Sequence, residues 1–197
     1  MPRISAQALY SACLYDGDAA AVSRLLPADG TRLNLSGPSF QTPDDNKWTP
    51  LIAAATHGHT EIVRTIRERA PNTAVDYVDA NGATALLAAA HYHHADILRL
   101  LTDRRANVNV EAGQQRNTPL RLAVGPLHAD TPPRGPDPDG ARQLSTVKAL
   151  LLLGAGTLPL GPLSPSDLAA QAQPFCTQLS RLEIRVLTTR VGADPPN

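Results

Sequence analysis

Cysteine, aromatic residues and net charge are all scarce in this sequence. Its 197 residues include only Cys13 and Cys176, and two thiols so far apart fit buried, reduced side chains better than a disulfide framework. Aromatic residues make up 4% of the chain, which suits closely packed helices better than a bulky central core. Lysine plus arginine balance aspartate plus glutamate at 18 each, so the overall charge favours neither nucleic acid nor a membrane surface as a partner.

Long apolar runs are missing as well. The N-terminal stretch 1–5 lacks the apolar segment of a signal peptide. No uninterrupted apolar run approaches the ~20 residues that a membrane-spanning helix needs. We therefore expect a cytoplasmic protein, with the nucleus left open, that is a monomer and makes no membrane contact.

The chain does contain an internal repeat. The stretch TPLIAAA at residues 49–55 recurs as TALLAAA at 84–90 and as TPLRLAV at 118–124, at spacings of 35 and 34 residues. A period of this length indicates one supersecondary unit stacked on copies of itself. Each copy opens on a threonine that can cap a helix, and proline at the next position suits the first helical turn. An alanine-rich helix, a turn and an amphipathic second helix are predicted to follow.

The repeat divides the chain into one domain, residues 1–191, and a short tail, 192–197, that we expect to be disordered. Proline and glycine are concentrated at about 129–142, which predicts an insertion between the two helices of the fourth unit. Short apolar stretches at 75–78 and 108–110 suit the arms of hairpins between units. The five predicted units, of which the outer ones are degenerate, span about 5–43, 44–78, 79–112, 113–157 and 158–191.

The order Thr-Pro-Leu-x-x-Ala-Ala, Gly-His, Ile-Val and Ala-Asn-Val-Asn resembles the ankyrin repeat. The resemblance implies an all-α ankyrin-repeat solenoid of stacked helix-turn-helix units with short β-hairpin fingers. It also implies a non-enzymatic module for protein–protein interaction, acting as an adaptor or regulator on a protein partner. Asn109 falls where asparagines of ankyrin repeats are often hydroxylated, and the resemblance leaves open whether it is modified.

Two departures from the family pattern affect the predicted fingers. The histidine that usually follows the leucine, and bonds to neighbouring hairpins, is replaced by Ile52, Leu87 and Arg121. We expect the corresponding hydrogen bonds to be absent. The hairpin glycine is present as Gly82 but is replaced by Lys47 and Arg116 elsewhere, and a left-handed backbone would be costly there. Regular fingers are therefore not expected in the second and fourth units.

In this family the hairpin tips and the ends of the first helices line a concave groove that contacts the partner. Trp48, the only tryptophan, is either an anchor of this groove or packed on its own hairpin. Carried over by register, the predicted partner-binding residues are Asp45, Asn46, Trp48, Thr56, His57, Asn81, His91, Tyr92, Gln114, Gln115, Asn117 and Arg121.

Catalytic and metal chemistry find little support in the sequence. We predict no catalytic residue because no nucleophile has an evident base and orienting acid. His59, His94 and His128 form a ladder by register, but repeats ~10 Å apart place them too far from each other to share one ion. We therefore expect no metal and no cofactor.

A second function remains open beside the interaction module. The proline-rich insertion and the long first finger could close the groove into a pocket around Trp48, His57, His91, Tyr92 and Arg121. The protein would then bind a small molecule or be an atypical enzyme, for instance in a biosynthetic pathway. An enclosed cavity of ~300 Å³ or more would favour this alternative.

Overall fold

The computed structural model describes residues 5–28, 33–37, 40–42, 47–103, 106–111, 117–124 and 141–155. Within this part of the chain the elements are helical and none is a strand, which confirms the all-α class. The elements, in chain order, are α1 (Ala6–Ser11), the π-helical segment η1 (Ala12–Asp16), α2 (Ala19–Leu25), α3 (Pro50–His57), α4 (Thr60–Arg69), α5 (Ala85–His91), α6 (Ala95–Thr102), α7 (Pro119–Val124) and α8 (Ala141–Leu152).

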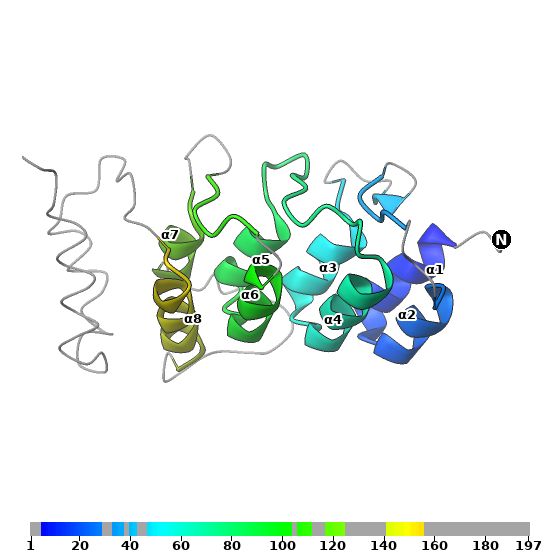
Figure 1. Ribbon diagram of the computed structural model, residues 1–197, viewed down its shortest axis with the longest axis horizontal. Coiled ribbons are helices and arrows are strands. Elements are labelled where there is room, and N and C mark those ends of the chain that lie inside the picture. Colours follow the sequence, from blue (N-terminus) through cyan, green and yellow to red (C-terminus); the bar gives the residue numbers. More distant parts are fainter. Residues whose placement is uncertain are drawn as a thin grey trace, which may run out of the picture.

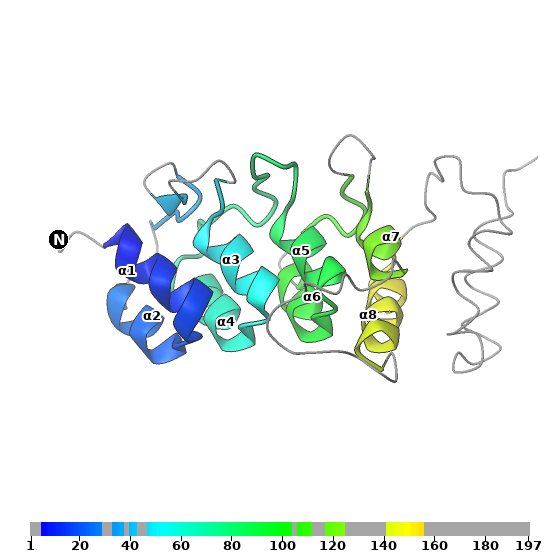
Figure 2. The ribbon, with the colours of Figure 1, turned by 180° about the vertical axis from the view of Figure 1, so that it is seen from behind.

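The helices stack as successive pairs in two rows (Figure 1). The first row holds α1 with η1, α3, α5 and α7, and the second row holds α2, α4, α6 and α8. Each helix packs on its neighbours in the same row as well as on its own pair. The view from behind brings the first row to the front and shows the connecting loops gathered along one edge (Figure 2). We call these loops the fingers. The predicted solenoid is confirmed over four helix pairs.

Threonine caps start the first-row helices as the sequence predicts. The hydroxyl oxygens of Thr49 and Thr84 accept hydrogen bonds from the amides of Ile52 and Leu87, both at 3.3 Å. Thr118 caps α7 in the same way. Each cap satisfies an amide that the helix itself cannot, and a cap of this kind contributes about 1 kcal/mol.

Small side chains let the first-row helices pack closely. The alanines of α3 and α5 are almost entirely buried, and Leu51 and Leu86 are buried beside them. In the second row the predicted apolar stripes face the same core, with Ile62, Val63 and Ile66 on α4 and Ile97, Leu98 and Leu101 on α6.

Histidine rings pack on glycines across two repeat boundaries. A Cβ placed on Gly17 would lie 2.8 Å from Cε1 of His59, and one placed on Gly58 would lie 2.5 Å from Cε1 of His94. Both glycines also have positive φ, at 59° and 74°. His94 is held further by a hydrogen bond between Nε2 and the carbonyl oxygen of Thr56, at 3.2 Å. Two rungs of the expected histidine ladder are thus structural contacts, and the third, His128, lies outside the described residues.

The fingers are built from turns rather than from the extended arms expected at 75–78 and 108–110. The amide of Tyr77 bonds to the carbonyl of Ala74, and that of Val110 to the carbonyl of Asn107. Local side-chain bonds compete with strand pairing here, because Oδ1 of Asn107 accepts from the amide of Asn109 at 3.0 Å.

Lys47 keeps the left-handed backbone that the glycine of this position would adopt, with φ of 55°. The second finger nevertheless closes in the same way as the third. The amide of Thr42 bonds to the carbonyl of Trp48 and its hydroxyl accepts from the Trp48 amide, at 2.9 and 3.0 Å. Asp79 and Ala83 make the same pair of bonds, at 2.9 and 2.7 Å. The second finger therefore closes regularly around a longer loop, contrary to the expectation. Arg116, in the fourth unit, lies outside the described residues.

Candidate partner-binding surface

Four of the predicted partner-binding residues lie outside the described part of the chain: Asp45, Asn46, Gln114 and Gln115. The other eight can be placed, and they do not form one uniform set. Trp48, His57, His91 and Tyr92 bring aromatic rings together in two neighbouring repeats. Thr56, Asn81, Asn117 and Arg121 occupy quite different surroundings.

Trp48 is half-buried and held at both its backbone and its ring. Its carbonyl oxygen accepts a hydrogen bond from the hydroxyl of Tyr10, and its ring packs against the edge of the core. The ring also meets that of His57 edge to face, with centroids 6.5 Å apart. Since Trp48 precedes α3 and His57 ends it, the indole lies along the helix. It packs on α3 and is fixed in place.

His57 extends the ring contacts toward the first repeat. Nδ1 of His57 hydrogen-bonds with the carbonyl oxygen of Ala53 at 3.0 Å, which fixes the ring against its own helix. Its other face stacks on His59, with centroids 5.9 Å apart and planes 14° from parallel. Three rings therefore follow one another from Trp48 to His59, and His59 rests on Gly17 of the preceding repeat.

The third repeat carries a second ring pair at the corresponding place. His91 and Tyr92 meet edge to face with centroids 4.8 Å apart, and both are half-buried. Partial burial raises the pKa of the Tyr92 hydroxyl, so this group remains a neutral hydrogen-bonding group at physiological pH. Tyr92 follows its capping threonine by as many residues as His57 does. Because α3 and α5 pack side by side, the two pairs lie at matching ends of neighbouring helices (Figure 2).

Thr56 is unsuited to the contact role that its register implied. It is only 6% exposed, and its hydroxyl donates to the carbonyl oxygen of Ile52 at 2.9 Å. Its own carbonyl oxygen bonds to His94 of the next repeat. The equivalent position one repeat later is His91, which does reach the surface. Register alone could not separate these two cases, because burial here depends on side-chain size and direction.

The remaining three predicted residues lie at the rim of the surface. Asn81 is exposed at a finger, with its amide bonded to Oδ1 of Asp79 at 2.8 Å. Asn117 is half-buried just before the capping threonine of α7. Arg121 is half-buried in α7, although its counterparts Ile52 and Leu87 are only 2% exposed.

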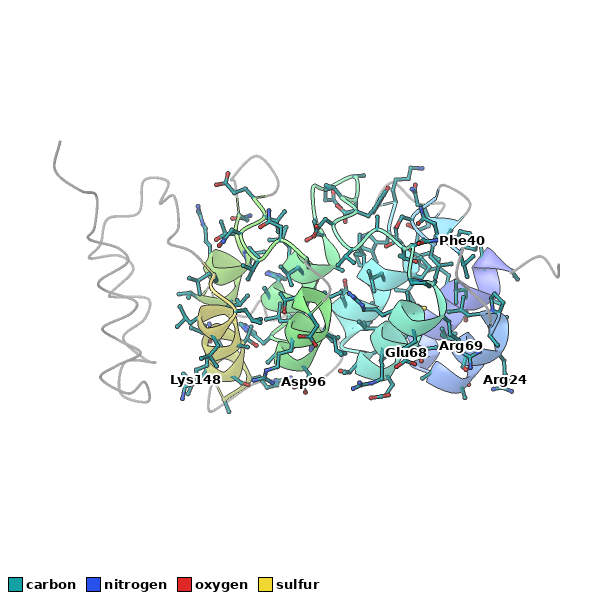
Figure 3. The ribbon with its side chains drawn as sticks, in the orientation of Figure 1. Arg24, Phe40, Glu68, Arg69, Asp96 and Lys148 are labelled. Carbon is teal, nitrogen blue, oxygen red and sulfur yellow. The ribbon has the colours of Figure 1, made fainter. Side chains whose placement is uncertain are left out.

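Several inter-repeat contacts are made by residues that the sequence did not single out. Tyr10 stands in the slot expected to lack inter-repeat bonds, and its hydroxyl makes one to Trp48. Nη1 of Arg69 donates to the carbonyl oxygens of Ser23 and Leu26 at the end of α2, where Figure 3 shows it. Gln143 donates in the same way to the carbonyls of Ala123 and Val124 at the end of α7. Only Tyr10 had a detectable signal, since it occupies the position of the family histidine.

A depression of about 130 Å³ lies beside α4 and the loop that follows it. It is lined by Leu51, Ile66, Arg67, Ala70, Pro71, Thr73 and Val75, none of which is a predicted site residue. Its volume is below the ~300 Å³ of a typical ligand pocket. This depression therefore does not support the small-molecule alternative.

Two further searches cover only the residues that the structure describes. Within them, no three histidine, cysteine, aspartate or glutamate side chains are grouped closely enough to hold a metal ion. Nor does any helix among them have the length and apolar character needed to cross a membrane.

Comparison with known proteins bears on the whole array. No curated protein sequence matches the chain. A family model described as ankyrin repeats, three copies, matches residues 9–112, just over half of the sequence. The match begins in α1 and extends beyond α6, so it covers the first three helix pairs. The chain therefore belongs to the ankyrin repeat family.

Proposed function

We propose that this protein is an interaction module that binds a protein partner across the C-terminal ends of α3 and α5. Ankyrin repeats are generally protein–protein interaction modules without catalytic activity. The observation that carries the proposal is the aromatic row, by which we mean Trp48, His57, His91 and Tyr92. These rings are half-buried at matching ends of two neighbouring helices.

The aromatic row has the physical properties of a binding surface. Tryptophan and tyrosine bury a large area with few rotatable bonds, and they are enriched among residues that dominate interface energies. The rings are already ordered by edge-to-face contacts within each pair, so a partner would lose little further side-chain entropy on binding. The exposed finger residue Asn81 and the half-buried Arg121 could provide polar contacts at the rim.

We infer that the module acts by occupying or bridging its partner, as an adaptor or regulator, and that it catalyses no reaction. The same surface would serve in the complete domain, residues 1–191, with the proposed fifth unit extending the array. In this scheme the protein is a monomer until it meets its partner.

The test starts with affinity capture from the native host and continues with the purified partner. Because Trp48 is the only tryptophan, its fluorescence gives a direct titration signal when the partner carries no tryptophan of its own. Replacing His91 and Tyr92 together by alanine should weaken binding at least tenfold, or about 1.4 kcal/mol, while the melting temperature changes little.

The matched control is Arg64→Ala, an exposed side chain on α4 in the second row. It should leave the affinity unchanged. If the His91→Ala, Tyr92→Ala double variant binds the partner as tightly as the wild type, the aromatic row is not the binding surface.

A further inference from the structure

The last helix of the second row differs from the others on its outer surface. An exposed acid–base pair accompanies each of the first three: Asp18 with Arg24 at α2, Glu61 with Arg64 on α4 and Asp96 with Arg99 on α6, at 3.6, 3.4 and 3.0 Å. On α8 the corresponding surface carries no acidic side chain. We call it the α8 stripe, and it consists of Ala141, Ser145, Lys148 and Leu152.

Leu152 is the most unusual member of the α8 stripe, because it is 85% exposed. It follows the buried Leu150 by two residues, as Glu68 follows the buried Ile66 and Asp103 follows the buried Leu101. Glu68 and Asp103 are both exposed to water. Figure 3 shows Glu68, Asp96 and Lys148 along the same side of the second row. A leucine thus stands where the two preceding repeats place a charge.

Regular stacking of a fifth repeat would leave Leu152 uncovered. The second and third repeats have a neighbour on either side, and Glu68 and Asp103 are nevertheless exposed. An element that covers Leu152 must therefore lie across the outer surface of α8.

We propose that residues 175–190 of this chain form a helix that packs across the α8 stripe and covers Leu152. In that segment Phe175, Leu179, Leu182 and Val186 recur at helical spacing and would form one apolar face. Glu183, the only acidic residue of the segment, follows Leu179 by one turn. It would bring a negative charge to the stripe that carries Lys148. This proposal goes beyond the partner-binding function and does not depend on it.

The chain between the two helices is long enough for this arrangement. Residues 156–174 can span roughly 60 Å when extended, whereas the 12 residues of α8 cover about 18 Å. The helix at 175–190 can therefore return along α8 in either direction. Pro159, Pro162 and Pro165 lie in this connection and prevent α8 from simply continuing through it.

Hydrogen–deuterium exchange of the full chain tests the contact. Peptides from 175–190 should be protected in the wild type, and Leu152→Asp should raise their exchange rates at least tenfold while peptides from α3 to α6 are unchanged. The matched control, Arg64→Asp, places the same charge on the outer surface of α4 and should change nothing at 175–190. An unprotected segment in the wild type, or protection that survives Leu152→Asp, would overturn the proposal.

Two further measurements identify the occupant of the stripe. Leu152→Cys should be joined to the native Cys176 by a short bismaleimide within one chain, whereas Glu68→Cys should not. Glu183→Lys should speed exchange at 175–190, and adding Lys148→Glu should restore protection. A crosslink between two chains, or a dimer in sedimentation that Leu152→Asp dissociates, would assign the stripe to a second copy and refute the intramolecular contact.

Discussion

At the scale of single residues, the thiol of Cys13 illustrates what burial does to an ionisable group. Cys13 lies in η1 with no exposed surface, and the loss of hydration raises the pKa of its thiol from 9.0 to about 12. The neutral thiol therefore packs as a small apolar side chain, as its position in the sequence predicts. Its reactivity is suppressed because the thiolate is the nucleophilic form.

This pKa predicts how stability depends on alkaline pH. The folded pKa is raised, so the contribution of Cys13 is complete below about pH 9 and is lost as the pH rises toward 12. Between pH 9 and pH 10 the free energy of unfolding should fall by about 1 kcal/mol more with Cys13 present than with Cys13→Ala. Urea unfolding of both proteins, each in a Cys176→Ser background, gives the comparison. Equal pH dependence in the two proteins would contradict it.

At the scale of elements, the helices were predictable and the fingers were not. The threonine caps, the alanine-rich first helices and the apolar stripes of the second helices follow from local sequence patterns, and the structure confirms them. The fingers depend on side-chain bonds such as those of Asp79 and Thr42 to backbone amides. Such bonds are settled by geometry that spacing alone does not contain, so the turn at 75–78 was mistaken for an extended arm.

The second finger gives a direct prediction. Lys47 is exposed and has φ of 55°, a conformation that glycine adopts without strain. Lys47→Gly should therefore raise the free energy of unfolding by about 0.5 to 1 kcal/mol, after allowing for the greater freedom of glycine in the unfolded chain. The reciprocal change in the third finger, Gly82→Ala at φ of 81°, should lower it by a similar amount. Chemical denaturation measures both, and a destabilised Lys47→Gly protein would contradict the argument.

At the scale of the whole molecule, the contacts between neighbouring repeats hold the array together. Gly58 and His94 form the tightest of those described, because the ring occupies the space where a Cβ would be. Gly58→Ala should cost about 3 kcal/mol, from the left-handed backbone and the collision together.

His94 provides the control for this prediction. In a His94→Ala background the collision is removed, and Gly58→Ala should cost only about 1 to 2 kcal/mol for its backbone. A double-mutant cycle on unfolding free energies measures the difference. Additive costs would show that the ring and the glycine are not coupled.

The candidate site was only partly predictable at this scale. Register identified the ring-bearing positions at the ends of α3 and α5, and the structure places Trp48 beside His57 and His91 beside Tyr92. Register also assigned Thr56 to the surface, where packing has buried it. The bond from Tyr10 to Trp48 was missed because it joins different residue types in neighbouring repeats. Contacts of this kind depend on how repeats stack, which no single repeat encodes.

The inter-repeat hydrogen bonds have a regular separation along the chain. Tyr10 with Trp48, Leu35 with Thr73 and His94 with Thr56 are each 38 residues apart. Forming any of them closes a loop of about one repeat, whose entropic cost is modest and does not grow with the length of the array. The molecule consequently has low contact order, and its folding can nucleate in any adjacent pair of repeats and spread from there.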